Sequence, residues 1–177
     1  MADRIRNPRE DLLTTIANAT LGEKPLSQSY LDGSWLLIIF AGNDTTRNSL
    51  SGTIRLLTEF PEQRQMVLDD PSFIERMSHE ALRMVSPVMH MRRTAMEDTE
   101  IAGQRIAKDE KVIMWYGAAN RDSSVFPNPD QFDMMRDNVD KHLAFGHGVH
   151  RCLGNRVAQL QLKMAYERIL ERFPDIY

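Results

Sequence analysis

The one cysteine of this 177-residue chain, Cys152, lies in a stretch with small neighbours. Taken alone, a free cysteine is most often a buried, unreactive thiol. Three flanking residues, however, have no side chain to keep a flat ligand away from the backbone: Gly146, Gly148 and Gly154. A helix is predicted to begin just after Cys152, and its free N–H groups and dipole favour a negatively charged sulfur. Phe145 supplies an aromatic wall that limits solvent near that sulfur. These neighbours are compatible with a reactive thiolate that binds the metal of a flat ligand.

A second candidate is an acid followed directly by an alcohol, Asp44 and Thr45. The pair lies in a run of poor helix formers at 41–46, in the middle of a long helical pattern, and such a run predicts a kink or a π-bulge. An adjacent acid and alcohol can deliver protons to a reacting group. The alternative is a simple bend or cap, in which Asp44 pairs with Arg47 or Asn48 on the next turn.

A third candidate is the pair Glu80 and Arg83, whose spacing of three places both side chains on one face of a helix. By itself such a pair is an exposed ion pair that contributes roughly 0.2–0.5 kcal/mol. It gains a functional meaning only if other parts of the chain bury it.

Three helices are expected to position these residues: a long one at about 27–60, a shorter one that carries Glu80, and a long one at 154–173. A helical pattern from about Ser27 to Phe60 ends at Pro61. Its length is roughly 50 Å at 1.5 Å per residue, whereas helices average about 11–12 residues, so it is expected to run through the core. Asp70 and Pro71 are a good N-cap and first residue for the helix that carries Glu80. That helix ends before Pro87 and has an apolar face made of Phe73, Ile74, Met77, Ala81 and Leu82.

The remaining pattern predicts smaller elements around these helices. Residues 9–19 and 61–68 read as short helices, 100–106 as a hairpin around Gly103, and 111–116 as a strand. The stretch 126–148 lacks regular periodicity but contains apolar residues, so we expect an ordered loop. A last helix is predicted at 154–173, with four apolar residues facing inward: Val157, Leu160, Met164 and Ile169.

Composition excludes several classes of protein. The net charge of −3 and the absence of a basic tail give no reason to expect nucleic-acid binding. The longest apolar run, 35–41, is too short to cross a bilayer, and the charged start is neither a signal peptide nor an anchor. One cysteine cannot form an internal disulfide. We therefore expect a cytoplasmic protein without a membrane span.

The cysteine stretch resembles the signature of bacterial cytochrome P-450, the haem-thiolate monooxygenases. Counted from Cys152, that signature has Phe seven places before, Gly six and four before, a basic residue two before and Gly two after. All five positions match: Phe145, Gly146, Gly148, His150 and Gly154. The resemblance implies haem b (iron protoporphyrin IX) as cofactor, Cys152 as the axial ligand to its iron, and His150 as a hydrogen-bond donor to a haem propionate. His142 and His147 lie nearby, but we expect neither to bind the metal.

The other motifs match the same family in order and spacing. In its distal-helix motif, Ala41 and Gly42 lie against the haem, Asp44 relays protons, and Thr45 hydrogen-bonds dioxygen and water. Its Glu-x-x-Arg helix corresponds to Glu80 and Arg83. A later arginine of the family completes a buried triad that supports the cysteine loop, which here is 145–154. Arg136 lies where that third member is expected. Arg93 lies where the family has a propionate-binding arginine, with Arg92 as the alternative, because arginine and carboxylate form a two-pronged hydrogen bond.

The resemblance implies a mainly α fold with small β hairpins. It corresponds to the C-terminal half of the cytochrome P-450 fold: long distal helix, Glu-x-x-Arg helix, cysteine loop and final helix. Residues 1–177 are accordingly expected to form part of a haem domain, without its N-terminal helices and extreme C-terminus. We expect little activity from this piece alone, because the substrate pocket lacks its roof.

The family's activity would be hydroxylation of unactivated C–H bonds of an apolar substrate by O2. Three stretches are similar to the soluble alkane and fatty-acid terminal hydroxylases, namely 42–49, 90–95 and 114–116; sterol and terpene hydroxylases share much of the first. Electrons would come from NAD(P)H through a ferredoxin reductase and a ferredoxin, to which Lys141, Arg151 and Arg156 offer a basic face. Two rivals are a peroxide-driven enzyme and a non-catalytic haem-binding fragment or sensor.

Overall fold

The computed structural model describes residues 2–176, and the chain divides into two compact units, Met1–Asp44 and Thr45–Tyr177. No helix among the described residues is both long and apolar enough to span a membrane. The architecture is mainly helical with three two-stranded antiparallel sheets, so the predicted fold class is confirmed.

The first unit begins with two short helices, α1 (Ala2–Arg6) and α2 (Leu12–Ala17). Asp11 caps α2, because its carboxylate accepts the backbone N–H of Thr14 at 2.7 Å. A small hairpin follows, in which β1 (Thr20–Leu21) pairs with β2 (Lys24–Pro25). Gly22 makes its turn with a φ of +63°, which a residue with a side chain adopts only at a cost. The sequence predicted a short helix at 9–19 but not the hairpin.

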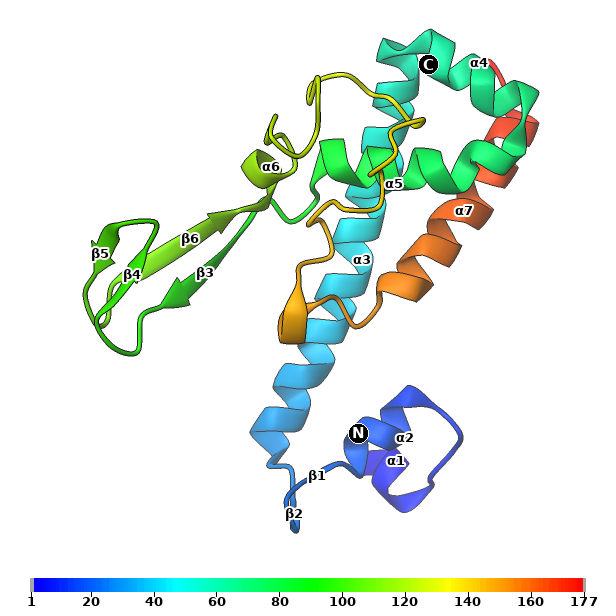
Figure 1. The fold of residues 1–177 in the computed structure, drawn as a ribbon. Coiled ribbons are helices and arrows are strands. Elements are labelled where there is room, and N and C mark those ends of the chain that lie inside the picture. The colour runs from blue at the N-terminus through cyan, green and yellow to red at the C-terminus, as the bar shows by residue number, and fades with distance from the viewer. Residues whose placement is uncertain (1, 177) are drawn as a thin grey trace. The chain divides into compact units, whose positions relative to one another are not determined.

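The long helix α3 (Gln28–Glu59) is present as predicted and crosses from the first unit into the second (Figure 1). Every residue between its ends is α-helical, so of the two alternatives predicted at 41–46 the π-bulge is not present, and the kink stays a prediction. Poor helix formers lower helix stability by only about 0.7–1 kcal/mol each, and helix formation is cooperative along strong flanking turns. Hydroxyl groups are accommodated by bonding to the preceding turn: Ser49 Oγ donates to the Thr45 carbonyl at 2.7 Å.

Three elements follow α3 in the second unit: α4 (Pro61–Asp69), the 3-10 turn η1 (Pro71–Phe73) and α5 (Ile74–Val85). Asp70 acts as the predicted N-cap, because its carboxylate accepts the N–H of Ser72 at 2.9 Å. At the other end Ser86 turns the chain with a φ of 44° just before Pro87. These local signals fix the length and direction of α5, which carries Glu80 and Arg83.

Two β ribbons lie between α5 and the cysteine loop in sequence (Figure 1). Strand β3 (His90–Thr94) pairs antiparallel with β6 (Lys111–Trp115), and β4 (Thr99–Ile101) pairs with β5 (Gln104–Ile106). The short helix α6 (Tyr116–Ala119) follows. The hairpin and the strand at 111–115 were predicted, whereas β3 was not.

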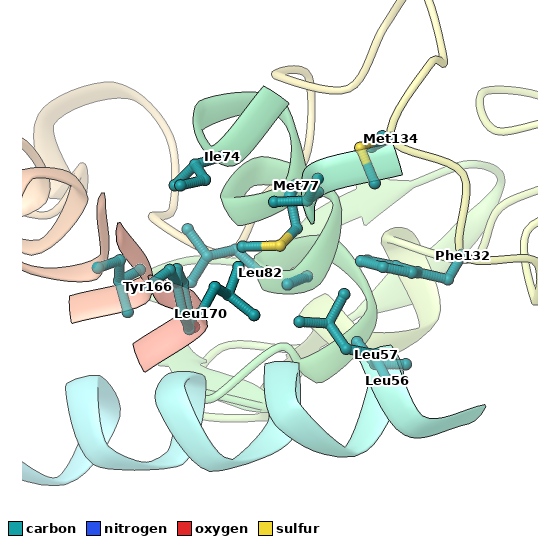
Figure 2. Close-up of a cluster of buried hydrophobic side chains, with 12 residues drawn as sticks. Leu56, Leu57, Ile74, Met77, Leu82, Phe132, Met134, Tyr166 and Leu170 are labelled. Atoms are coloured by element: carbon teal, nitrogen blue, oxygen red, sulfur yellow. The ribbon is translucent and has the colours of Figure 1, made fainter. Parts of the chain in front are cut away.

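The core of the second unit lies between α3, α4, α5 and the last helix, α7 (Asn155–Arg172), as Figure 2 shows in part. The irregular stretch before the cysteine loop contributes Phe132 and Met134, both almost fully buried, so the prediction of an ordered loop is confirmed. This core cluster consists of twelve buried residues: Leu56, Leu57, Val67, Ile74, Met77, Ala81, Leu82, Phe132, Met134, Leu162, Tyr166 and Leu170.

The buried face of α7 differs from the predicted one. Val157, Leu160 and Met164 are each more than half exposed, and Ile169 is half-buried. The helix packs against the core through another stripe instead: Leu162, Tyr166 and Leu170. The Tyr166 hydroxyl donates to Thr53 Oγ1 of α3 at 2.6 Å, and burial raises the pKa of that phenol. Because α7 has apolar residues on two faces, its packing partners decide which face is buried.

Candidate functional site

Glu80 and Arg83 form a fully buried ion pair on α5, not an exposed one. The guanidinium of Arg83 makes a bidentate pair with the carboxylate of Glu80: Nε donates to Oε2 and one terminal nitrogen donates to Oε1, both at 2.8 Å. Its remaining N–H groups donate to three backbone carbonyls, those of Asn120, Pro129 and Gln131, at 2.7, 2.8 and 3.1 Å. All five donors of Arg83 are therefore satisfied, and the guanidinium also lies 5.2 Å from the centre of the Phe126 ring.

The structure places Arg136 in the same network. Its Nε donates to Glu80 Oε1 at 3.0 Å, and its side chain is 6% exposed. The terminal nitrogens of Arg136 donate to the carbonyls of Pro127, Asn128 and Gln131. Glu80 Oε1 additionally accepts the N–H of Asp133 at 3.0 Å. Glu80 thus binds both arginines that the resemblance grouped with it, and the two arginines satisfy the carbonyls of an irregular loop that has no strand partner of its own.

Two further residues extend this network, and the sequence did not single out either as a site residue. Arg76 on α5 donates to the carbonyls of Met134 and Arg136 at 2.9 and 2.7 Å. Asn120 is fully buried; its side-chain oxygen accepts the N–H of Leu143 at 2.7 Å, and its own carbonyl accepts from Arg83. Because Leu143 is three residues before Gly146, Asn120 connects the ion-pair network to the start of the cysteine loop.

The cysteine loop turns sharply between Phe145 and α7. Gly146 and Gly148 have φ values of +68° and +62°, the left-handed region that favours glycine. The N–H of Cys152 donates to the carbonyl of Phe145 at 2.8 Å and closes the loop. The short turn η2 (Gly148–His150) lies inside it. Phe145 packs its ring against the core, while Cys152 and His150 are exposed three and five residues before α7 begins.

Gly146→Ala should lower stability by about 1–2 kcal/mol, because a left-handed conformation costs that much for a residue with a Cβ. The added Cβ would also lie 3.2 Å from the carbonyl oxygen of His150. Gly103→Ala is the matched control, since Gly103 has a φ of +80° in the β4–β5 turn with open space around it. Urea unfolding and the haem-to-protein ratio of the intact protein measure the two effects. Both variants should lose stability, but only Gly146→Ala should lose haem; equal haem content in the two would contradict a special role for this turn.

The remaining predicted site residues lie on other elements. Arg93 and Arg92 are exposed neighbours on β3, opposite Val112 and Ile113 of β6 respectively. Ala41, Gly42 and Asp44 lie in the part of α3 that belongs to the first unit. Thr45 begins the second unit, is half-buried, and accepts the Ser49 hydroxyl at its carbonyl.

Two histidines meet beside the cysteine loop. His79 Nδ1 on α5 lies 3.2 Å from His142 Nε2, and their ring centres are 5.4 Å apart. His142 is buried. Burial lowers the pKa of His142 to about 4, and burial also lowers the pKa of His79. Sequence gave no signal for the pair, because the two residues are 63 positions apart.

The comparisons with known proteins agree with this arrangement. The family model for Cytochrome P450 matches residues 68–174. Linalool 8-monooxygenase of Pseudomonas putida is 44% identical over 169 residues, which is 96% of this chain and 41% of that protein. The methyl-branched lipid omega-hydroxylase of Mycobacterium bovis is 36% identical over 180 residues, 98% of this chain and 41% of that protein. The chain thus spans about two fifths of the length of these relatives.

A solved structure is similar as well. Cytochrome P450-153 from Novosphingobium aromaticivorans superposes with a TM-score of 0.79 at 46% identity, over 88% of this chain and 38% of that one. The family match covers the Glu-x-x-Arg helix, both β ribbons, the cysteine loop and all of α7. The chain therefore belongs to the cytochrome P450 family.

Proposed function

We propose that the intact protein is a haem-thiolate monooxygenase, which inserts one oxygen atom of O2 into a C–H bond of an apolar substrate. The observation that carries the proposal is the position of exposed Cys152, in a turn that contains two positive-φ glycines and ends three residues before α7. Hydrogen bonds of Asn120 connect this loop to the buried Glu80 network. Members of the family bind haem, and Cys152 is the residue whose chemistry suits its iron.

The local structure fits a flat cofactor at Cys152. A Cβ at Gly148 would have open space around it, and a Cβ at Gly154 would make only an ordinary contact, at 4.0 Å, with the Cys152 sulfur, so the chain leaves space beside both glycines. Among residues 2–176, no group of three or more histidine, cysteine, aspartate or glutamate side chains gathers to hold a metal. In the proposed site a porphyrin would supply the other ligands of the metal, and Cys152 would be the ligand from the protein.

His150 and Arg93 would bind the propionates. Exposed His150 is two residues from Cys152, and its ring can donate a hydrogen bond to a carboxylate. Arg93 is preferred over Arg92 because of strand alternation. Arg93 pairs with half-buried Val112, whereas Arg92 pairs with Ile113, which is 48% exposed.

Bound haem would supply the redox chemistry that splits O2, and a thiolate ligand favours O–O cleavage. The chain's own residues would manage protons. The reaction consumes two electrons and two protons, because one oxygen atom enters the substrate and the other leaves as water. We assign Asp44 to take protons from solvent and Thr45 to pass them on through its hydroxyl. The buried Glu80–Arg83–Arg136 network would keep the cysteine loop in place.

The proposed substrates are alkanes or fatty acids hydroxylated at the terminal carbon. The stretches 42–49, 90–95 and 114–116 support this class, as does similarity to a lipid omega-hydroxylase. Terpene hydroxylation is the second candidate, favoured by 44% identity to linalool 8-monooxygenase. Electrons would come from NAD(P)H through a ferredoxin reductase and a ferredoxin. Docking would use exposed Lys141, Arg151 and Arg156 beside the cysteine loop.

Turnover of the intact protein tests these proposals. Ferredoxin, reductase and NADH are supplied with a fatty acid, an alkane or linalool, and products are identified by mass spectrometry. A terminal alcohol of the alkane or fatty acid supports the first class, and oxidised linalool alone supports the second. Faster product formation with peroxide alone would overturn the monooxygenase proposal. Bound haem with no NADH consumption on any substrate would favour a sensor.

Thr45→Ala should uncouple NADH oxidation from product formation, because the hydroxyl that passes protons is lost. We expect hydrogen peroxide released per NADH to rise several-fold, because oxygen that is not protonated for O–O cleavage leaves as peroxide. Thr58→Ala is the matched control, since exposed Thr58 is on the same helix and donates only to its own turn, at the Ile54 carbonyl. Unchanged coupling in Thr45→Ala would contradict the proton-transfer role.

A further inference from the structure

His79 and His142 link three parts of the second unit beside the cysteine loop. His79 comes from α5, directly before Glu80, and His142 comes from the irregular segment before Phe145. On the far side of His79, its Nε2 lies 3.5 Å from the side-chain amide of Gln159 on α7. On the far side of His142, its Nδ1 lies 3.2 Å from the backbone N–H of Ala144. The four groups form a continuous chain of contacts.

The backbone end of this chain fixes where the protons lie. The N–H of Ala144 can only donate, so Nδ1 of His142 must accept, and a neutral His142 therefore carries its hydrogen on Nε2. That hydrogen points at His79 Nδ1, which must accept in turn, so His79 carries its hydrogen on Nε2. Gln159 must then present its amide oxygen to His79; amide oxygen and nitrogen are exchanged by a simple flip. Any other arrangement places two donors face to face.

An added proton breaks this order at either ring. A proton on His142 Nδ1 would face the Ala144 N–H, and a proton on His79 Nδ1 would face the hydrogen on His142 Nε2. Burial opposes charge on both rings. The charged groups that act on the pair come from α5, the loop and α7. Glu75 and Asp140 favour protonation of the pair, whereas Arg76, Arg83 and Arg151 oppose it, and Lys163 lines the cavity beside His79.

The pair bears directly on the loop that holds Cys152. Ala144, which His142 accepts from, precedes Phe145, whose carbonyl binds the N–H of Cys152. The rings of His142 and Phe145 are also in contact, with centres 5.8 Å apart. A cavity of about 200 Å³ between α5 and α7, lined in part by His79 and Gln159, gives protons from solvent a route to the pair.

We infer that His79 and His142 are positioning residues: a neutral, proton-ordered pair that holds the cysteine loop on α5 and α7 and releases it when protonated. The inference rests on the proposed role of Cys152 as a haem ligand. The sign of the effect follows from the pKa of His142, which is about 4 in the folded chain and about 6.5 when unfolded. Between about pH 4 and pH 6.5 the unfolded chain binds more protons than the folded chain. The loop is therefore stable above about pH 6.5 and is destabilised as the pH falls toward about 4.

Two readouts on the intact protein test the pair. The first is the nitrogen NMR spectrum of labelled histidines, which reports protonation and tautomer without reference to haem. We expect His142 to be neutral at pH 7 with its hydrogen on Nε2. A hydrogen on Nδ1, or a charged ring at that pH, would overturn the inference. The second is the thiolate-specific absorption of the reduced, carbon monoxide-bound protein, followed from pH 8 downwards, which we expect to disappear in the same acidic window.

His142→Asn is the informative variant, because its side-chain oxygen can replace Nδ1 as acceptor for Ala144 but cannot be protonated. We call the pH at which half of the thiolate-specific absorption is lost the acid midpoint. We expect the acid midpoint of His142→Asn to fall by about one pH unit or more, whereas an unchanged midpoint would overturn the inference. His79→Asn, which keeps an acceptor for His142, should shift the midpoint the same way. His90→Asn is the control on β3 and should leave it unchanged. If no thiolate absorption appears at pH 8, the proposed function fails, and the NMR spectrum still decides the pair.

Discussion

Arg83→Ala should destabilise the intact protein by about 3–5 kcal/mol and strip it of haem, because removing one member of a buried charged network leaves the others uncompensated. Arg83 is fully buried and makes two bonds to Glu80 and three to loop carbonyls. Without it, Glu80 retains only Arg136 and a backbone N–H. The carbonyl of Asn120 also loses its donor, which weakens the connection to Leu143 and the cysteine loop.

Urea unfolding and the haem-to-protein ratio measure this prediction. Arg55→Ala is the matched control, since Arg55 forms an exposed pair with Glu59 at 2.7 Å on α3. Such pairs contribute only about 0.3–0.5 kcal/mol, so the control should keep both its stability and its haem. Arg83→Lys should resemble Arg83→Ala, because an ammonium has three donors and no planar fork. Full haem content in Arg83→Ala, with a loss below about 1 kcal/mol, would contradict the bracing role.

Much of the fold could be predicted because its signals are local. Asp70 and Pro71 mark the start of the turn that leads into α5, and Pro87 marks its end. The apolar spacing along α5 identifies its buried face, since Ile74, Met77, Ala81 and Leu82 are all buried. Gly103 similarly marks the β4–β5 turn, where its φ is +80°. In each case a few neighbouring residues determine the backbone conformation.

Other features could not be predicted because they depend on distant partners. Strand β3 reads as polar, with His90, Arg92 and Arg93, and is a strand only because β6 pairs with it from 17 or more positions later. The choice between the two apolar faces of α7 was wrong for a similar reason. Tyr166, on the face that is buried, is bonded to Thr53, 113 residues earlier.

The candidate site shows the same division between local and distant information. The Glu80–Arg83 spacing is visible in the sequence, but its burial and its bond to Arg136 depend on a loop 56 residues later. Family resemblance pointed to Arg136 because a signature retains such distant contacts. Arg76 and the His79–His142 pair carry no comparable signal, although they lie in the same network or beside it.

The largest expected effect belongs to Cys152. Cys152→Ala removes the only thiol of the chain, so no thiolate from this chain can reach the haem iron. Cys152→Ser is the conservative variant, because a hydroxyl keeps the size and a hydrogen-bonding group but is not a thiolate at neutral pH. The backbone bond from residue 152 to the Phe145 carbonyl needs no side chain. Both variants should therefore remain folded, with a urea midpoint close to that of the unaltered protein.

Carbon monoxide binding measures this ligand most directly. The intact protein is loaded with haem, reduced and exposed to carbon monoxide, and its Soret absorption is compared with that of folded Cys152→Ala and Cys152→Ser. A strongly red-shifted band in the unaltered protein, absent from both variants, is the predicted result. A red-shifted band that survives in Cys152→Ala, or that never appears in folded, haem-loaded protein, would contradict Cys152 as the ligand.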